Sequence, residues 1–228
     1  MPPPKYQISG SILFSWAQFL LMVHLGANGL ASTHQTTFIY VVRNCMKLFF
    51  VRHGETIDNA RRICQGQLPG ALNTAGYAQA KNLASAMASL PLDACISSDL
   101  HRAIETSRTL IAPHPQLVIQ EDKRLRERHF GNLQGKVMPL SWDGLAPMEG
   151  AEPMEAVFAR AQDFIQHIQA TSPTKNILIV SHGITLMALT AVCLGYTLSQ
   201  IRLLPLPQNC SMTCFEPTTD GCFRTVSP

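Results

Sequence analysis

The sequence contains 228 residues, of which 46% are hydrophobic and 14% are charged, and its formal net charge is +3 at pH 7. This hydrophobic fraction excludes a generally disordered chain and is enough for one large domain or two small ones. The small net charge, without a run of Lys and Arg, argues against nucleic acid as a partner. The small net charge is still compatible with a small anionic substrate, because such a substrate needs only a few well-placed cations.

The cysteines indicate a reducing compartment. There are seven of them, an odd number, and no pair of Cys-x-x-C motifs accompanies them. Cys210 and Cys214 are four residues apart but have no histidine close by in the sequence, which argues against a zinc site. We therefore expect reduced thiols in a cytoplasmic protein.

Residues 1–45 differ from the rest of the chain, with no Asp, Glu, Lys or Arg between Ile12 and Leu30. Three interpretations remain open: a signal peptide, a membrane anchor through residues 11–31, and a natural start at Met46. Polar residues and glycines dilute the stretch of about 20 apolar residues that an anchor needs. We favour the start at Met46, with residues 46–228 as the catalytic domain. A signal or anchor would instead predict export or membrane attachment.

The first predicted strand, 47–51, ends in Arg52-His53-Gly54. Residues 57–70 are polar and contain glycines, which predicts a loop that includes Asn59 and Gln65-Gly66. Asn73 or Thr74 then caps a helix whose apolar residues recur at helical spacing until Pro91.

A second short strand is predicted at 94–97, and Ser98 or Asp99 is expected to cap the next helix. Arg102 falls in the first turn of that helix, where a cation opposes the helix dipole. Because this placement is locally unfavourable, it suggests a functional role for Arg102. Residues 117–119 form a third strand candidate.

The clearest strand is the wholly apolar segment 177–180, which is followed by Ser181-His182-Gly183 and a buried helix over 184–194. Pro153 starts the helix that precedes this strand. Residues 211–216 and 223–226 form a last pair of strands. Alternating strands and helices predict an α/β fold with a mainly parallel sheet.

Three predicted junctions between a strand and a helix carry Arg or His, and in a parallel sheet they lie at one edge. Two arginines, Arg52 and Arg102, and two histidines, His53 and His182, are therefore expected to converge there. The helix that follows Gly183 directs backbone N–H groups to the same place, which favours an anion and makes Gly183 a candidate substrate contact.

This chemistry fits phosphoryl transfer through His53, with the two arginines and His182 binding the phosphoryl oxygens. A carboxylic acid must protonate the leaving oxygen, and both Glu127 and Glu55 are candidates. The sequence has no P-loop pattern and no acidic metal cluster. We therefore expect neither a metal nor another cofactor.

Four segments then resemble the histidine phosphatase superfamily, in its phosphoglycerate-mutase-like branch. They are Arg52-His53-Gly54-Glu55-Thr56 with Asn59, Ser97 to Ala103, Leu125 to Arg128 with Phe130-Gly131, and Val180 to Gly183. The resemblance spans about Met46 to Glu216 and implies a three-layer α/β/α sandwich.

The resemblance also implies site roles. It makes His53 the phosphorylated nucleophile, and Arg52, Arg102 and His182 the phosphate pocket. It selects Glu127 over Glu55 as the acid. Asn59, Gln65 and Gly66 match substrate contacts of the family, whereas Glu55 is expected to support Arg52, and Arg126 and Arg128 to serve structure or the rim of the pocket.

The segment after Gly135 is short and neutral, whereas the phosphoglycerate mutases of this superfamily carry a longer basic and aromatic insertion at the same place. This favours a phosphatase for a small phosphorylated metabolite, of sugar-phosphate or α-ribazole-phosphate type. Gly150-Ala151-Glu152 departs from the family's usual pattern. Phosphoglycerate mutase and a non-catalytic binding relative remain the alternatives, and the sequence indicates no oligomeric state.

Overall fold

The structure, a computed structural model, describes residues 46–227. The predictions about the start site, the signal and the anchor concern residues 1–45 and lie outside this range. Within the described range, no helix is both long enough and apolar enough to cross a membrane.

Six strands form one sheet in the order β3-β2-β4-β1-β5-β6. The first four strands in this order are parallel to one another, and β5 and β6 are antiparallel to their neighbours. The strands are β1 (Lys47–Arg52), β2 (Ala94–Ser97), β3 (Ile119–Glu121), β4 (Asn176–Ser181), β5 (Met212–Pro217) and β6 (Phe223–Val226).

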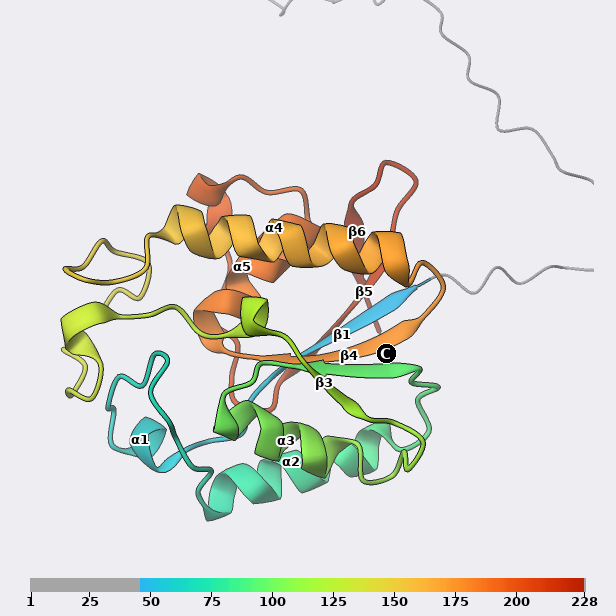
Figure 1. Ribbon diagram of the computed structural model, residues 1–228, viewed down its shortest axis with the longest axis horizontal. Coiled ribbons are helices and arrows are strands. Elements are labelled where there is room, and N and C mark those ends of the chain that lie inside the picture. Colours follow the sequence, from blue (N-terminus) through green and yellow to red (C-terminus); the bar gives the residue numbers. More distant parts are fainter. Residues whose placement is uncertain (1–45, 228) are drawn as a thin grey trace, which may run out of the picture. The chain divides into compact units, whose positions relative to one another are not determined.

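Helices cover both faces of this sheet. Figure 1 shows α4 and α5 on one face and α2 and α3 on the other. The helices are α1 (Ile57–Ala60), α2 (Thr74–Met87), α3 (His101–Leu110), α4 (Met154–Thr171) and α5 (Gly183–Cys193), with 3₁₀ helices at η1 (Lys123–Leu125), η2 (Gly131–Leu133) and η3 (Leu198–Leu203). The predicted three-layer α/β/α architecture is confirmed.

Alternation along β1 explains why this strand is apolar throughout. Leu48 and Phe50 pack into the core beneath α4 and α5, while Phe49 and Val51 pack into the core beneath α2 and α3. Successive side chains of a strand point to opposite faces, so a strand covered on both sides has no polar face. β4 follows the same pattern.

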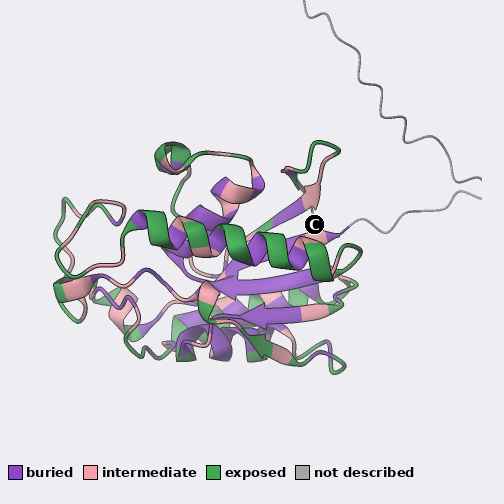
Figure 2. Ribbon diagram, turned by 45° about the horizontal axis from the view of Figure 1, so that its top comes forward, coloured by how far each residue is buried: buried purple, intermediate pink, exposed green. Residues whose placement is uncertain are grey.

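The helices differ in how much of their surface reaches solvent. In Figure 2, α4 shows an exposed outer side and a buried inner side. Most residues of α5 are buried, consistent with the buried helix predicted after His182.

Four local predictions were wrong. The third strand begins at Ile119, because it is an edge strand that pairs on one side only, and Val118 is 76% exposed. The segment predicted as a loop contains α1, which Thr56 and Asn59 hold by a reciprocal capping box. The N-cap of α3 is Leu100, not Ser98 or Asp99. Pro153 is the N-cap of α4 and not its first helical residue.

Candidate active site

Strand register brings the predicted junctions together. Arg52 of β1 lies opposite Ser181 of β4, and Val180 of β4 lies opposite Ser97 of β2. The residues that follow these strands therefore emerge side by side at the carboxyl edge of the sheet, where open α/β sheets bind ligands.

The imidazole of His53 is held in one orientation. Its Nδ1 lies 2.7 Å from the carbonyl oxygen of Gly54, which can only accept, so Nδ1 carries the proton. Its Nε2 therefore keeps the lone pair, and Nε of Arg102 donates to it at 3.3 Å. Asn209 donates to the main-chain oxygen of His53 at 2.8 Å. The unprotonated nitrogen, Nε2, is thus held beside the cation of Arg102.

Burial keeps His53 neutral. Its side chain is buried, and this burial, followed by the charges of Arg102 and Arg52, lowers the pKa of His53 well below its ordinary value of 6.5. A neutral imidazole has the lone pair that a nucleophile needs.

Arg102 connects His53 to the loop before α2. Its Nη2 donates to the oxygen of Gly66 at 2.6 Å, and its Nη1 donates to the oxygen of Leu68 at 3.0 Å. Burial lowers the pKa of Arg102 to about 10, partly offset by Glu127. The guanidinium therefore remains charged at neutral pH.

Arg52 is oriented by the segment before β5. Its Nη1 donates to the oxygen of Pro207 at 2.7 Å. Its Nε is buried and has no hydrogen-bond partner among residues 46–227. Buried donors are nearly always paired, so this N–H group is a candidate donor to a ligand.

His182 lies behind His53. The two ring centroids are 5.1 Å apart, and His182 is fully buried without lining the cavity. The hydroxyl of Ser98 accepts from the N–H of Leu100 and lies 2.8 Å from Nε2 of His182, so this nitrogen is already paired. Nδ1 of His182 is buried and has no partner within the described part of the chain, which makes it a candidate contact for a ligand.

The carboxylate of Glu127 lies at the amino end of α5. Its carboxylate accepts from the backbone N–H groups of Ile184 and Thr185, both at 3.2 Å, and from that of Arg128 at 2.9 Å. We expected the amino end of this helix to bind the substrate's anion. These two amides instead hold the carboxylate of Glu127, which places it beside the cavity.

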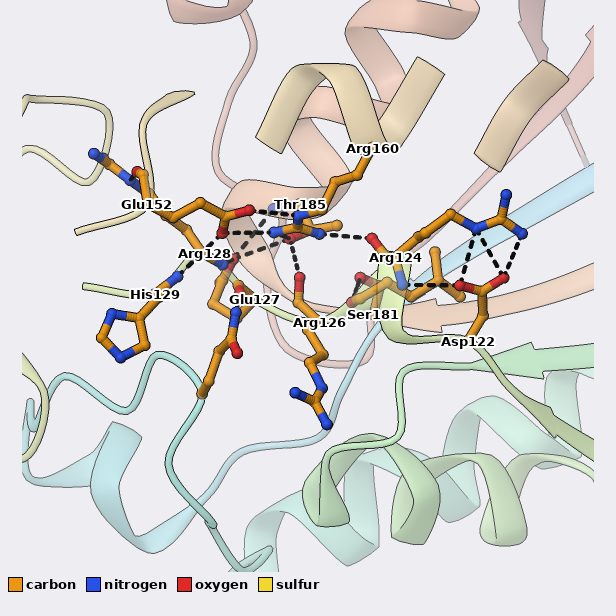
Figure 3. Close-up of polar contacts among 12 residues, drawn as sticks. Asp122, Arg124, Arg126, Glu127, Arg128, His129, Glu152, Arg160, Ser181 and Thr185 are labelled. Atoms are coloured by element: carbon orange, nitrogen blue, oxygen red, sulfur yellow. Dashed lines mark hydrogen bonds and ion pairs between the residues drawn. The ribbon is translucent and has the colours of Figure 1, made fainter. Parts of the chain in front are cut away.

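Arg160 of α4 reaches the residues around this carboxylate and lies beside Thr185 and Glu152 (Figure 3). It pairs with Glu152 at 2.8 Å, donates to the oxygen of Arg124 at 2.6 Å and approaches the hydroxyl of Thr185 at 3.4 Å. That hydroxyl donates in turn to the oxygen of Arg126 at 2.7 Å. The same hydroxyl lies 3.3 Å from Oε1 of Glu127, so these contacts reach the carboxylate itself.

One cavity of about 100 Å³ gathers most of the predicted site. It is lined by His53, both arginines and Glu127, and by the predicted contact residues Asn59, Gln65, Gly66 and Gly183. Nε2 of Gln65 donates to Thr56 at 2.6 Å, and its Oε1 is buried with no partner among residues 46–227.

Two neighbouring predictions have different outcomes. Glu55 was expected to support Arg52, but its carboxylate accepts from Asn73 at 2.6 Å, at the start of α2. Arg126 and Arg128 do serve structure. Arg126 pairs with Asp99 through two hydrogen bonds, and the buried Arg128 donates to the oxygens of Gly144, Ala146 and Glu152.

A sequence model of the histidine phosphatase superfamily (branch 1) matches residues 48–226. The chain belongs to this superfamily. It is 30% identical to adenosylcobalamin/alpha-ribazole phosphatase of Salmonella typhimurium, over 72% of this chain and 88% of the relative. It is 32% identical to phosphoglycerate mutase-like protein 4 of Arabidopsis thaliana, over 60% of this chain and 66% of that relative.

A solved structure shows the same architecture. Mycobacterial glucosyl-3-phosphoglycerate phosphatase, in complex with VO3, superimposes with a TM-score of 0.72 and 27% identity, over 80% of this chain and 98% of that protein. The predicted family, fold and phosphatase type are confirmed.

Several residues around the site could not be identified as site residues from the sequence. Ser98, Thr106, Arg160, Thr185 and Asn209 act through hydrogen bonds between distant segments. Arg160 alone left a signal, because it interrupts the apolar stripe of α4 between Val157 and Phe164. The remaining four have no spacing that separates them from ordinary polar residues.

Proposed function

We propose that this enzyme hydrolyses phosphomonoesters through a phosphohistidine at Nε2 of His53. The observation that carries the proposal is the fixed tautomer: Nδ1 is bound to Gly54, and the lone pair on Nε2 lies beside Arg102. An imidazole held in this way can attack phosphorus without first losing a proton.

In the first step, the lone pair of His53 Nε2 forms the N–P bond as the ester P–O bond breaks. Glu127, as a carboxylic acid, gives its proton to the departing oxygen. A bound phosphoryl dianion favours this protonated form. Arg52, Arg102 and Nδ1–H of His182 are the proposed donors to the equatorial oxygens, where charge must be balanced in the transition state.

In the second step, water attacks phosphorus and gives a proton to the Glu127 carboxylate. The P–N bond breaks, its electron pair returns to His53, and phosphate is released. One carboxyl group therefore serves as acid and then as base.

The cavity favours hydrolysis over the mutase reaction. A phosphoglycerate carries a second anionic group, yet the only cations that line the cavity in the described part of the chain are Arg52 and Arg102. Both are grouped around His53. The alternative of a silent binding relative is opposed by the complete acid, nucleophile and cation set.

Metal independence and a cytoplasmic location also belong to this proposal. The two guanidinium groups supply positive charge where a metal ion would otherwise act, so a chelator should leave the activity intact. The six cysteines within residues 46–227 are free, as expected in a reducing compartment.

The test is hydrolysis of p-nitrophenyl phosphate by the full chain. We expect His53→Ala to lower kcat by about a thousandfold or more, while His101→Ala, at an exposed position of α3, keeps wild-type activity. Unchanged hydrolysis by His53→Ala would refute the mechanism. Transfer of phosphate between positions of phosphoglycerate at a higher rate than its release would support the mutase instead.

A further inference from the structure

The cavity beside His53 is lined by both charged and apolar side chains. The charged ones are Arg52, Arg102 and Glu127. The large apolar ones are Ile63, Phe130, Met138, Trp142, Ile184 and Leu206.

Some of these apolar side chains also line a neighbouring hollow. Trp142, Ile184 and Leu206 line the cavity and also a hollow of about 390 Å³, which Met187 and Leu204 line as well. We call it the Leu204 hollow. Its two charged residues, Asp143 and Arg202, pair with each other at 2.7 Å. The Leu204 hollow therefore presents no unpaired charge to a ligand.

Trp142 also lines a second hollow. It has a volume of about 450 Å³, and Leu133, Lys136 and Glu149 are among its lining residues. It shares only Phe130 and Trp142 with the cavity. We call it the Lys136 hollow, and its charged groups would suit a substrate with a second ionised group.

Two close packings hold Trp142, Ile184 and Leu206 in place. A Cβ added to Gly183 would lie 2.8 Å from Leu206, and one added to Gly144 would lie 2.6 Å from Trp142 and 2.9 Å from Ile184. These side chains thus rest directly on backbone. Leu206 is nevertheless 45% exposed, and exposed apolar surface at the mouth of a site is typical of a ligand contact.

We propose that the enzyme selects phosphomonoesters of apolar, uncharged alcohols, whose carbon skeleton lies along Ile184 and Leu206 in the Leu204 hollow. This inference rests on the proposed function and narrows its substrate. A carboxylate or ammonium group placed there would meet no unpaired opposite charge, because Asp143 and Arg202 pair with each other. Sugar hydroxyls would contact mainly apolar side chains, which offer no hydrogen bonds.

The test compares four esters of primary alcohols, so that the leaving groups are chemically alike: 2-phenylethyl phosphate, ethyl phosphate, glucose 6-phosphate and O-phosphoserine. For the wild-type chain we expect kcat/KM for 2-phenylethyl phosphate to exceed that for O-phosphoserine by about a hundredfold. Glucose 6-phosphate should also be a poorer substrate than 2-phenylethyl phosphate.

Two leucine variants then locate the binding hollow. Leu204 and Leu133 are both half-buried, and each lies at the carboxyl end of a 3₁₀ helix, one in each hollow. Leu204→Ala should lower kcat/KM for 2-phenylethyl phosphate about tenfold and leave that for ethyl phosphate within about twofold. Leu133→Ala should change neither.

Other results would contradict the substrate inference, the Leu204 hollow or the proposed function separately. Equal or faster hydrolysis of O-phosphoserine or glucose 6-phosphate would overturn this inference while leaving the phosphatase proposal intact. An effect of Leu133→Ala in place of Leu204→Ala, or an equal loss on both esters, would refute the Leu204 hollow. If the wild-type chain hydrolyses none of the four esters, the proposed function fails and the inference with it.

Discussion

The carboxylate of Glu127 is held by its neighbour in the chain and by a distant helix. It accepts from the amide of Arg128 and from the amides of Ile184 and Thr185 in α5. The hydroxyl of Thr185 adds a further support, because it accepts from Arg160, donates to the main chain beside Glu127 and lies 3.3 Å from Oε1 of Glu127. Proton transfer is sensitive to such positioning, since the acid must reach the leaving oxygen.

We therefore predict that Thr185→Val lowers kcat about tenfold with little change in KM, because the acid loses its alignment while the phosphate pocket is kept. Thr190→Val in the same helix is the matched control and should behave as wild type. Steady-state kinetics with p-nitrophenyl phosphate measure both. A rise in KM without a fall in kcat would instead assign Thr185 to substrate binding.

The residues of the candidate site could be predicted from the sequence because they stand at the ends of apolar strands. Arg52, His53 and His182 are of this kind, and Arg102 drew attention by its poor fit to the helix dipole. Their partners could not be predicted. Ser98 and Asn209 acquire their roles only when segments far apart in the sequence fold against each other.

At the scale of elements, α2 packs against the turn that follows His53. A Cβ on Gly54 would lie 2.7 Å from the oxygen of Gly76, and a Cβ on Gly76 would lie 2.1 Å from the oxygen of Glu55. The backbone of Gly54 does not have a positive φ. Glycine is therefore required at both positions by the close approach of two backbones, and not by a left-handed backbone conformation.

This contact reverses the usual effect of alanine in a helix. Alanine normally stabilises a helix by about 1 kcal/mol over glycine. Gly76→Ala should instead lower the free energy of unfolding by about 2 kcal/mol, since the new methyl group meets backbone that cannot move aside. Urea denaturation measures this free energy.

Ala78→Gly, at an exposed position of the same helix, is the control for this prediction. It should cost about 1 kcal/mol, as expected where helix propensity alone decides. An increase in the free energy of unfolding for Gly76→Ala would show that α2 and the His53 turn are not in tight contact.

The long elements could be predicted from periodicity, whereas the short ones depended on their surroundings. β1 and β4 are covered on both faces and are apolar throughout, so they were recognised. β3 has a neighbour on one side only and carries little hydrophobic signal. α1 is one turn long, and its capping box decides its presence more than any apolar stripe does.

For the whole molecule, the buried site links stability to pH. Burial lowers the pKa values of both His53 and His182 well below 6.5. Below about pH 6.5 the unfolded chain binds protons that the folded chain does not, so stability falls as the pH decreases. Each histidine contributes at most about 1.4 kcal/mol per pH unit.

Accordingly, the wild-type chain should lose more free energy of unfolding between pH 7.5 and pH 5.5 than His182→Gln does, by about 1–2 kcal/mol. Urea denaturation at the two pH values gives both losses, and each variant serves as its own reference. Equal losses would mean that His182 is not held neutral in the folded state.

The central claim is that phosphate passes through Nε2 of His53. Mixing the enzyme with a ³²P-labelled phosphomonoester, quenching rapidly in alkali and mapping the labelled peptide tests it directly. We predict an acid-labile, alkali-stable label on the peptide that contains His53, which His53→Ala lacks. Normal turnover with the label absent from His53, or located on another residue, would contradict the account.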